Sequence, residues 1–121
     1  MIVREIAPVF KVTGAGVQYH TIAWEIRLVR DYADMSRRAA EHVLEALRRR
    51  PDLLLGAVTG DSPREMYRRL ARAWATSPRR FARLRVIAMD EWTGLPRGHE
   101  ATCEAFVRKE IVGPLRVARS R

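Results

Sequence analysis

The chain has 121 residues, of which 47% are hydrophobic and 31% are charged, and its 23 basic and 14 acidic residues give a formal net charge of +9. This length fits one domain with a buried core, and the composition excludes a disordered tail, a collagen-like fibre and a coiled coil. No apolar run approaches the roughly 20 residues of a membrane span, and the first residues do not read as a signal peptide, so we expect no membrane contact.

The first segment, 1–25, favours β-structure. Two stretches with β-branched and aromatic residues, 5–12 and 17–24, flank a turn that contains two glycines, which predicts a hairpin. Pro8 favours an edge strand. A start of translation further along the chain is a second interpretation, in which this segment is an extension outside the native fold.

Strand patterns and helix patterns alternate in the second segment, 26–121. We predict strands at 26–29, 53–58 and 84–89, and residues 115–117 begin a further strand. The runs at 53–58 and 84–89 are apolar without alternation, which is typical of strands buried on both faces of a parallel sheet.

Helices are predicted between and after these strands. The first covers residues 34–50 with Asp34 as N-cap, and the second follows Ser62, whose hydroxyl suits a cap. The third begins at Glu100. This order predicts an α/β fold, a Rossmann-like parallel sheet with flanking helices.

Two polar loops follow the predicted strands, at the carboxyl ends where such sheets bind ligands. The first, Thr59-Gly60-Asp61-Ser62, leads into a helix N-terminus that suits a phosphate; an ordinary turn with a serine cap is the alternative. The second begins with Asp90-Glu91. A buried carboxylate there has the raised pKa of a general acid or base, whereas a capping Asp and a surface Glu are the alternative.

Other kinds of site are not indicated. The three histidines and Cys103 do not have the spacing of metal ligands, and neither a Walker lysine nor a GxGxxG motif is present, so we expect no metal and no cofactor. A single cysteine cannot form an internal disulfide, which favours a reducing, cytoplasmic setting.

The positive charge has two interpretations. A basic surface binds nucleic acid or other anions, whereas an arginine-rich chain with two lysines is typical of a GC-rich genome. The arginines are spread along the chain and are not gathered beside aromatic residues. We therefore expect no nucleic-acid partner.

These motifs together resemble the glucosamine-6-phosphate deaminase (isomerase) family, within the 6-phosphogluconolactonase superfamily. Residues 54–63 look like its phosphate loop, and Met-Asp-Glu-Trp-Thr-Gly-Leu-Pro at 89–96 looks like its signature Met-Asp-Glu-Tyr-x-Gly-Leu. The resemblance covers about residues 26–117. The related 6-phosphogluconolactonases usually carry Asp-Glu-Arg in the second motif, so the deaminase branch fits better.

The resemblance implies a cytoplasmic enzyme of amino-sugar metabolism, which converts glucosamine 6-phosphate and water to fructose 6-phosphate and ammonia without a cofactor. It implies that Asp90 is the general base, which moves a proton between C2 and C1 of the opened sugar. It also implies that the phosphate is bound by Thr59, Gly60, Asp61 and Ser62, although Asp61 stands where the family usually has Gly or Ser. The partner is a phosphorylated amino sugar, and a homo-oligomer is left open.

Family members are longer, and their second half carries a Gly-rich Asp-Gly-His segment for ring opening that this sequence does not contain. The resemblance therefore implies a truncated, N-terminal half of such an enzyme, an incomplete domain with weak or no activity on its own. A non-catalytic sugar-phosphate sensor and a 6-phosphogluconolactonase-like hydrolase are the alternatives.

Overall fold

The computed structural model describes residues 2–3, 9–13, 16–20 and 27–118. The chain divides into two compact units, Met1–Tyr32 and Ala33–Arg121.

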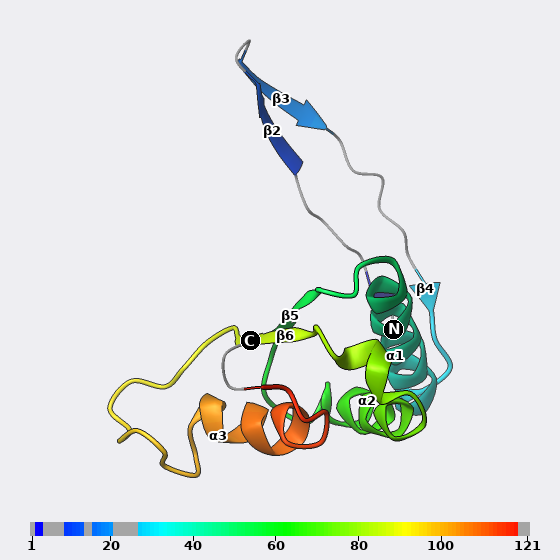
Figure 1. The fold of residues 1–121 in the computed structure, drawn as a ribbon. Coiled ribbons are helices and arrows are strands. Elements are labelled where there is room, and N and C mark those ends of the chain that lie inside the picture. The colour runs from blue at the N-terminus through cyan, green and yellow to red at the C-terminus, as the bar shows by residue number, and fades with distance from the viewer. Residues whose placement is uncertain (1, 4–8, 14–15, 21–26, 119–121) are drawn as a thin grey trace. The chain divides into compact units, whose positions relative to one another are not determined.

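The first unit contains two antiparallel strand pairs, and Figure 1 shows the longer one in blue. Strand β1 (Ile2–Val3) pairs with β4 (Arg27–Leu28), and β2 (Val9–Thr13) pairs with β3 (Gly16–His20). The second pair is a hairpin of the kind that the sequence predicts. The outer parts of its predicted strands, 5–8 and 21–24, and the middle of its turn lie outside the described residues.

The strand predicted at 26–29 is shorter than expected and has a different partner. Only Arg27 and Leu28 form β4, which pairs antiparallel with β1 and takes no part in a parallel sheet. Residue 26 lies outside the described residues. Both residues of β4 are exposed, so this segment does not have the buried side chains that fix a central strand of a parallel sheet.

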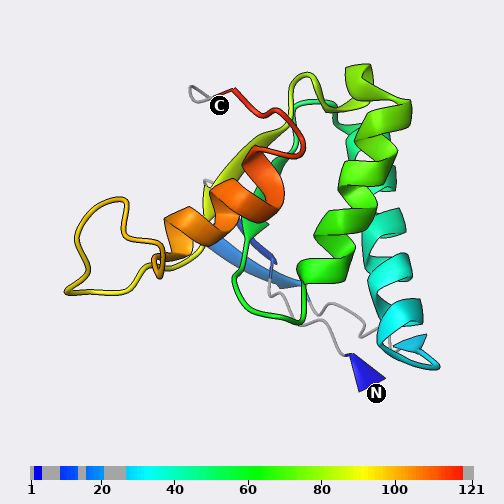
Figure 2. The same ribbon diagram turned by 90° about the horizontal axis from the view of Figure 1, so that it is seen from below.

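The second unit is built around a parallel pair of strands, which confirms the predicted α/β fold. Strand β5 (Leu54–Ala57) pairs with β6 (Arg85–Ala88), and the helix α2 (Arg64–Thr76) connects them, followed by the short 3₁₀ turn η1 (Pro78–Phe81). The helix α1 (Tyr32–Arg49), which belongs to this unit from Ala33 on, runs beside α2 (Figure 2).

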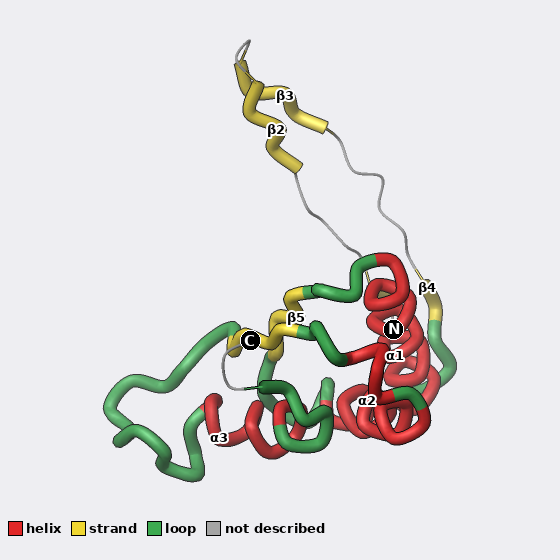
Figure 3. The backbone as a smooth tube through the Cα atoms, in the orientation of Figure 1, coloured by secondary structure: helices red, strands yellow, loops and turns green. Residues whose placement is uncertain are grey.

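A long loop leads from β6 to the short helix α3 (Cys103–Val107), which continues into the π-helical turn η2 (Arg108–Val112) (Figure 3). None of the described helices is long and apolar enough to cross a membrane. The predicted strand at 115–117 is not formed, because the Leu115 and Val117 amides donate back to carbonyls of η2, those of Ile111 and Val112.

The core of the second unit lies on one face of the strand pair, where Ala57 is fully buried and Leu55 packs at its margin. On the opposite face, side chains are 48–62% exposed: Leu54, Val58, Ile87 and Met89. The predicted burial of both strand faces is therefore wrong for this chain. The apolar run permits burial on both faces, but the described helices pack their apolar sides into a single core.

The predicted helix starts also need correction. Helix α1 begins at Tyr32, so Asp34 lies in its first turn, buried and paired with Arg37 at 2.7 Å and Arg38 at 3.3 Å. Helix α2 has Pro63 as N-cap and no side-chain cap bond, so Ser62 does not cap it. A proline has no N–H to satisfy, which lets it occupy this position. Helix α3 begins at Cys103 and not at Glu100.

Candidate functional site

The two polar loops begin side by side at the carboxyl edge of the strand pair. Ala57 lies opposite Ala88 in the parallel register, and the Met89 amide donates to the Ala57 carbonyl at 3.0 Å. The loop after β5 and the loop after β6 therefore leave from adjacent points, and Thr59 and Asp90 follow within two residues of that pair. The strand pairing brings together what the sequence predicts to be one site.

Tyr67 of α2 fixes the end of β5. Its hydroxyl donates to the Val58 carbonyl at 2.8 Å and accepts from the Val58 amide at 3.1 Å. The residue is 2% exposed. Burial raises the pKa of the Tyr67 phenol, and its bond to Val58 has a smaller, opposing effect, so the phenol stays neutral to a higher pH than an ordinary tyrosine. The backbone directly before Thr59 is thus held to the core.

The four predicted phosphate-binding residues differ in their surroundings. Thr59 is half-buried, with its Oγ1 3.7 Å from Cys103 Sγ at the start of α3. Gly60 has φ of +103°, in the region that favours glycine. Ser62 is exposed, and the Asp61 side chain is 92% exposed and turned to Arg64 at 2.8 Å.

Arg64, which the sequence does not mark as a site residue, also contacts the loop after β5. Its Nη1 contacts Asp61, its Nε lies 3.4 Å from Glu110 Oε1, and its guanidinium carbon lies 5.2 Å from the centre of the Phe106 ring. The ion pair with Asp61 offsets the negative charge that this departure from the family pattern brings to the loop. The sequence carries no signal for this pair, because the i,i+3 rule applies within a helix and Asp61 lies before α2.

Glu91 supports the second loop through three backbone hydrogen bonds. Its Oε1 accepts from the amides of Trp92 and Cys103, both at 2.8 Å, and its Oε2 accepts from the Glu104 amide at 2.9 Å. These three bonds hold the pKa of the Glu91 carboxyl below its ordinary value, and the bond from the Glu104 amide has the largest effect. Glu91 therefore fastens the loop to the N-terminus of α3.

Asp90 lies directly beside this anchor and is exposed. Among the described residues, its carboxylate has no hydrogen bond or ion pair. The expected burial of a carboxylate at this point is wrong, since both Asp90 and Glu91 are exposed in the open loop. Within the part of the chain that the structure describes, no group of three or more His, Cys, Asp or Glu side chains could hold a metal ion.

Comparison with known proteins identifies what this segment is similar to. No family model matches the chain. It is 36% identical over 80 residues to a glucosamine-6-phosphate deaminase of Arthrobacter sp. (strain FB24), a match that covers 66% of this chain and 31% of that protein. It is 34% identical over 91 residues to a glucosamine-6-phosphate deaminase of Streptomyces coelicolor, covering 75% of this chain and 35% of that protein.

The fold gives a similar result. A solved structure of a monomeric glucosamine-6-phosphate deaminase, from work that describes it as a missing link of the NagB superfamily, superposes with a TM-score of 0.63 at 25% identity. The match covers 69% of this chain and 34% of that one. The matched segment thus spans about a third of the length of these relatives.

Proposed function

We propose that this chain, a partial match to the glucosamine-6-phosphate deaminase family, carries the phosphate loop and the general base of a sugar-phosphate isomerase and deaminase of amino-sugar metabolism. The reaction is the conversion of glucosamine 6-phosphate and water to fructose 6-phosphate and ammonia, in the cytoplasm. The observation that carries the proposal is the shared sheet edge, from which both loops leave at paired residues.

The loop after β5 is proposed to bind the phosphate. Gly60 lets the backbone approach an anion closely, and the hydroxyls of Thr59 and Ser62 are further donors. The N-terminus of α2, which follows directly, adds a partial positive charge. Asp61 fits this role because its carboxylate is paired with Arg64.

Asp90 is proposed as the general base. A carboxylate takes the proton from C2 of the opened sugar and returns it to C1, which requires a side chain that reaches the substrate and has a free oxygen. Within the described residues, both carboxylate oxygens of Asp90 are free, whereas both oxygens of Glu91 are occupied by amides of the loop and α3. The division of roles between the two neighbours follows from these bonds.

The relatives contain about two thirds of their length outside the matched segment, so we expect the 121-residue chain alone to show little or no turnover. A chimera tests the general base directly. In it, the matching segment of this chain replaces the corresponding 80 residues of the Arthrobacter relative, and ammonia release from glucosamine 6-phosphate is measured.

Asp90→Asn in this chimera is expected to lower kcat by about 10²- to 10⁴-fold, the usual contribution of a general base. Asp52→Asn is the matched control, because Asp52 is also exposed but precedes β5 at the opposite edge of the strand pair. Ammonia release that is unchanged by Asp90→Asn refutes the general-base assignment.

Binding by the chain itself separates the alternatives. Titration with glucosamine 6-phosphate is expected to shift the Gly60 amide resonance in an NMR spectrum, and glucosamine without phosphate is expected to leave it unchanged. Tight binding together with an inactive chimera favours a sugar-phosphate sensor. Hydrolysis of 6-phosphogluconolactone by the chimera, without ammonia release, favours the hydrolase.

A further inference from the structure

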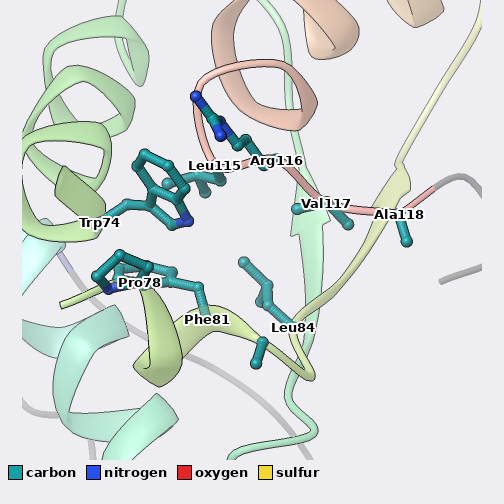
Figure 4. Close-up of a pocket in the computed structure, with 9 residues that line it drawn as sticks. Trp74, Pro78, Phe81, Leu84, Leu115, Arg116, Val117 and Ala118 are labelled. Atoms are coloured by element: carbon teal, nitrogen blue, oxygen red, sulfur yellow. The ribbon is translucent and has the colours of Figure 1, made fainter.

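A concave site lies at the other end of the strand pair from Asp90. It is a pocket of about 230 Å³ beside the amino end of β6, between the end of α2, η1 and the segment after η2 (Figure 4). Phe81, Leu84 and Leu115 line it and are at most 3% exposed. The floor is therefore part of the hydrophobic core of the second unit.

The two polar side chains of the pocket, Trp74 and Arg116, are hydrogen-bond donors. The guanidinium carbon of Arg116 lies 5.0 Å from the centre of the Trp74 ring, and the indole nitrogen of Trp74 faces the pocket (Figure 4). Stacking on a ring leaves the N–H groups in the guanidinium plane available to an acceptor. Among the described residues, no carboxylate pairs with Arg116.

Arg116 is also unusual in its backbone, with φ of 47°. This is the left-handed region, which residues other than glycine, asparagine and aspartate rarely adopt. Such strain persists only where the surrounding structure holds it. Here the neighbouring Leu115 is anchored in the core, and the strained residue places its cation at the rim of the pocket.

We infer that this pocket binds a small organic anion, a monocarboxylate with a single aromatic ring or a branched aliphatic body. The apolar floor contacts the body of the ligand, and the N–H groups of Arg116 and Trp74 donate hydrogen bonds to its carboxylate. The volume fits one ring and is below the roughly 300 Å³ at which sites for drug-sized ligands begin, so a nucleotide does not fit. This inference is independent of the proposed function, because it uses the opposite end of the strands.

Benzoate is the probe, and the full 121-residue chain is titrated with it while the Trp74 indole N–H is followed by NMR. We expect a saturable shift of this resonance. Benzyl alcohol has the same ring without the charge, and we expect it to bind at least about tenfold more weakly, as for the loss of a hydrogen bond to a charged group.

Arg116→Gly removes the cation and is expected to weaken benzoate binding at least about tenfold. Glycine adopts this φ without strain, so the variant is expected to stay folded. Arg83→Ala is the control, since it removes one exposed charge near the pocket without lining it. Ala82→Phe places a ring in the pocket and is expected to abolish the Trp74 shift.

Three results overturn the inference. The first is the absence of a saturable shift with benzoate. The second is equal affinity for benzoate and benzyl alcohol. The third is benzoate binding that neither Arg116→Gly nor Ala82→Phe weakens.

Discussion

Gly60 determines the course of the loop before α2 through its backbone angle. Its φ of +103° is rare for a residue with a side chain, although no atom lies within 4 Å of the position that a Cβ would take. A substitution there is therefore disfavoured by the backbone conformation and not by crowding.

Gly60→Ala is expected to lower the free energy of unfolding by about 1 kcal/mol or more, because alanine is strained at this angle. Urea unfolding measures the change. Ser62→Ala is the neighbouring control and is expected to cost less than about 0.5 kcal/mol, since this exposed serine caps no helix. A loss of about 1 kcal/mol in Ser62→Ala, typical of a removed N-cap, would contradict the structure.

Tyr67→Phe is expected to lower the free energy of unfolding by about 2 kcal/mol, because it leaves both backbone groups of Val58 without their partner. Hydrogen exchange gives the local readout, and the Val58 amide is expected to exchange faster in the variant. Unchanged exchange at Val58 together with a loss of global stability would mean that Tyr67 acts by packing alone.

The Tyr67 phenol makes the free energy of unfolding depend on pH. Its pKa is raised in the folded state, so its contribution to stability is present below the ordinary value of 10.0 and is lost as pH rises through the folded value. Tyr67→Phe is expected to reduce the loss of stability at alkaline pH, measured by urea unfolding on both sides of that value.

At the scale of elements, α3 depends on the loop that precedes it. The helix has five residues, too few to be stable by itself. Thr102 Oγ1 accepts from the Ala105 amide at 3.1 Å, and Glu91 accepts from the amides of Cys103 and Glu104. The N–H groups that a helix leaves without partners at its start are satisfied by these two side chains.

Glu91→Gln is expected to destabilise the chain above the ordinary carboxyl pKa of 4.5 and to leave stability below that range nearly unchanged. The pKa of Glu91 is lowered in the folded state, so its contribution is present above that value and is lost as pH falls through the folded value. Urea unfolding at several pH values tests this. An equal effect at all pH values would mean that shape, and not charge, is what Glu91 provides.

The central elements were predictable, and their ends were not. The apolar runs locate β5 and β6 to within one residue at each end, because burial requires such runs. Helix starts depend on local partners that the pattern does not show. Asp34 pairs with two arginines inside α1, and Pro63 takes the position that Ser62 was expected to hold.

At the scale of the molecule, the one-sided packing of the strand pair predicts unequal effects of similar substitutions. Leu84→Ala is expected to cost about 2–5 kcal/mol, since Leu84 is 1% exposed in the core. Leu54→Ala is the matched control and is expected to cost less than about 1 kcal/mol, since Leu54 is 50% exposed. Equal losses of stability, measured by urea unfolding, would mean that the second face is also buried in solution.

The site was predictable where topology determines it. Parallel strands place their carboxyl ends together, so the meeting of the two loops follows from the apolar runs. The exposure of Asp90, the anchor that Glu91 forms and the pairing of Asp61 with Arg64 depend on contacts with α3 and α2. Such contacts depend on side-chain geometry, which spacing along the chain does not determine.

The Cys103 thiol can report on the opening of α3. It is the only cysteine of the sequence, and it lies 2% exposed where α3 meets Thr59. A thiol reagent reaches it only after α3 separates from the loop, so the rate of labelling, divided by the rate for an unfolded chain, gives the equilibrium constant for that opening. A ligand that tightens the carboxyl edge slows this labelling, whether or not any product is formed.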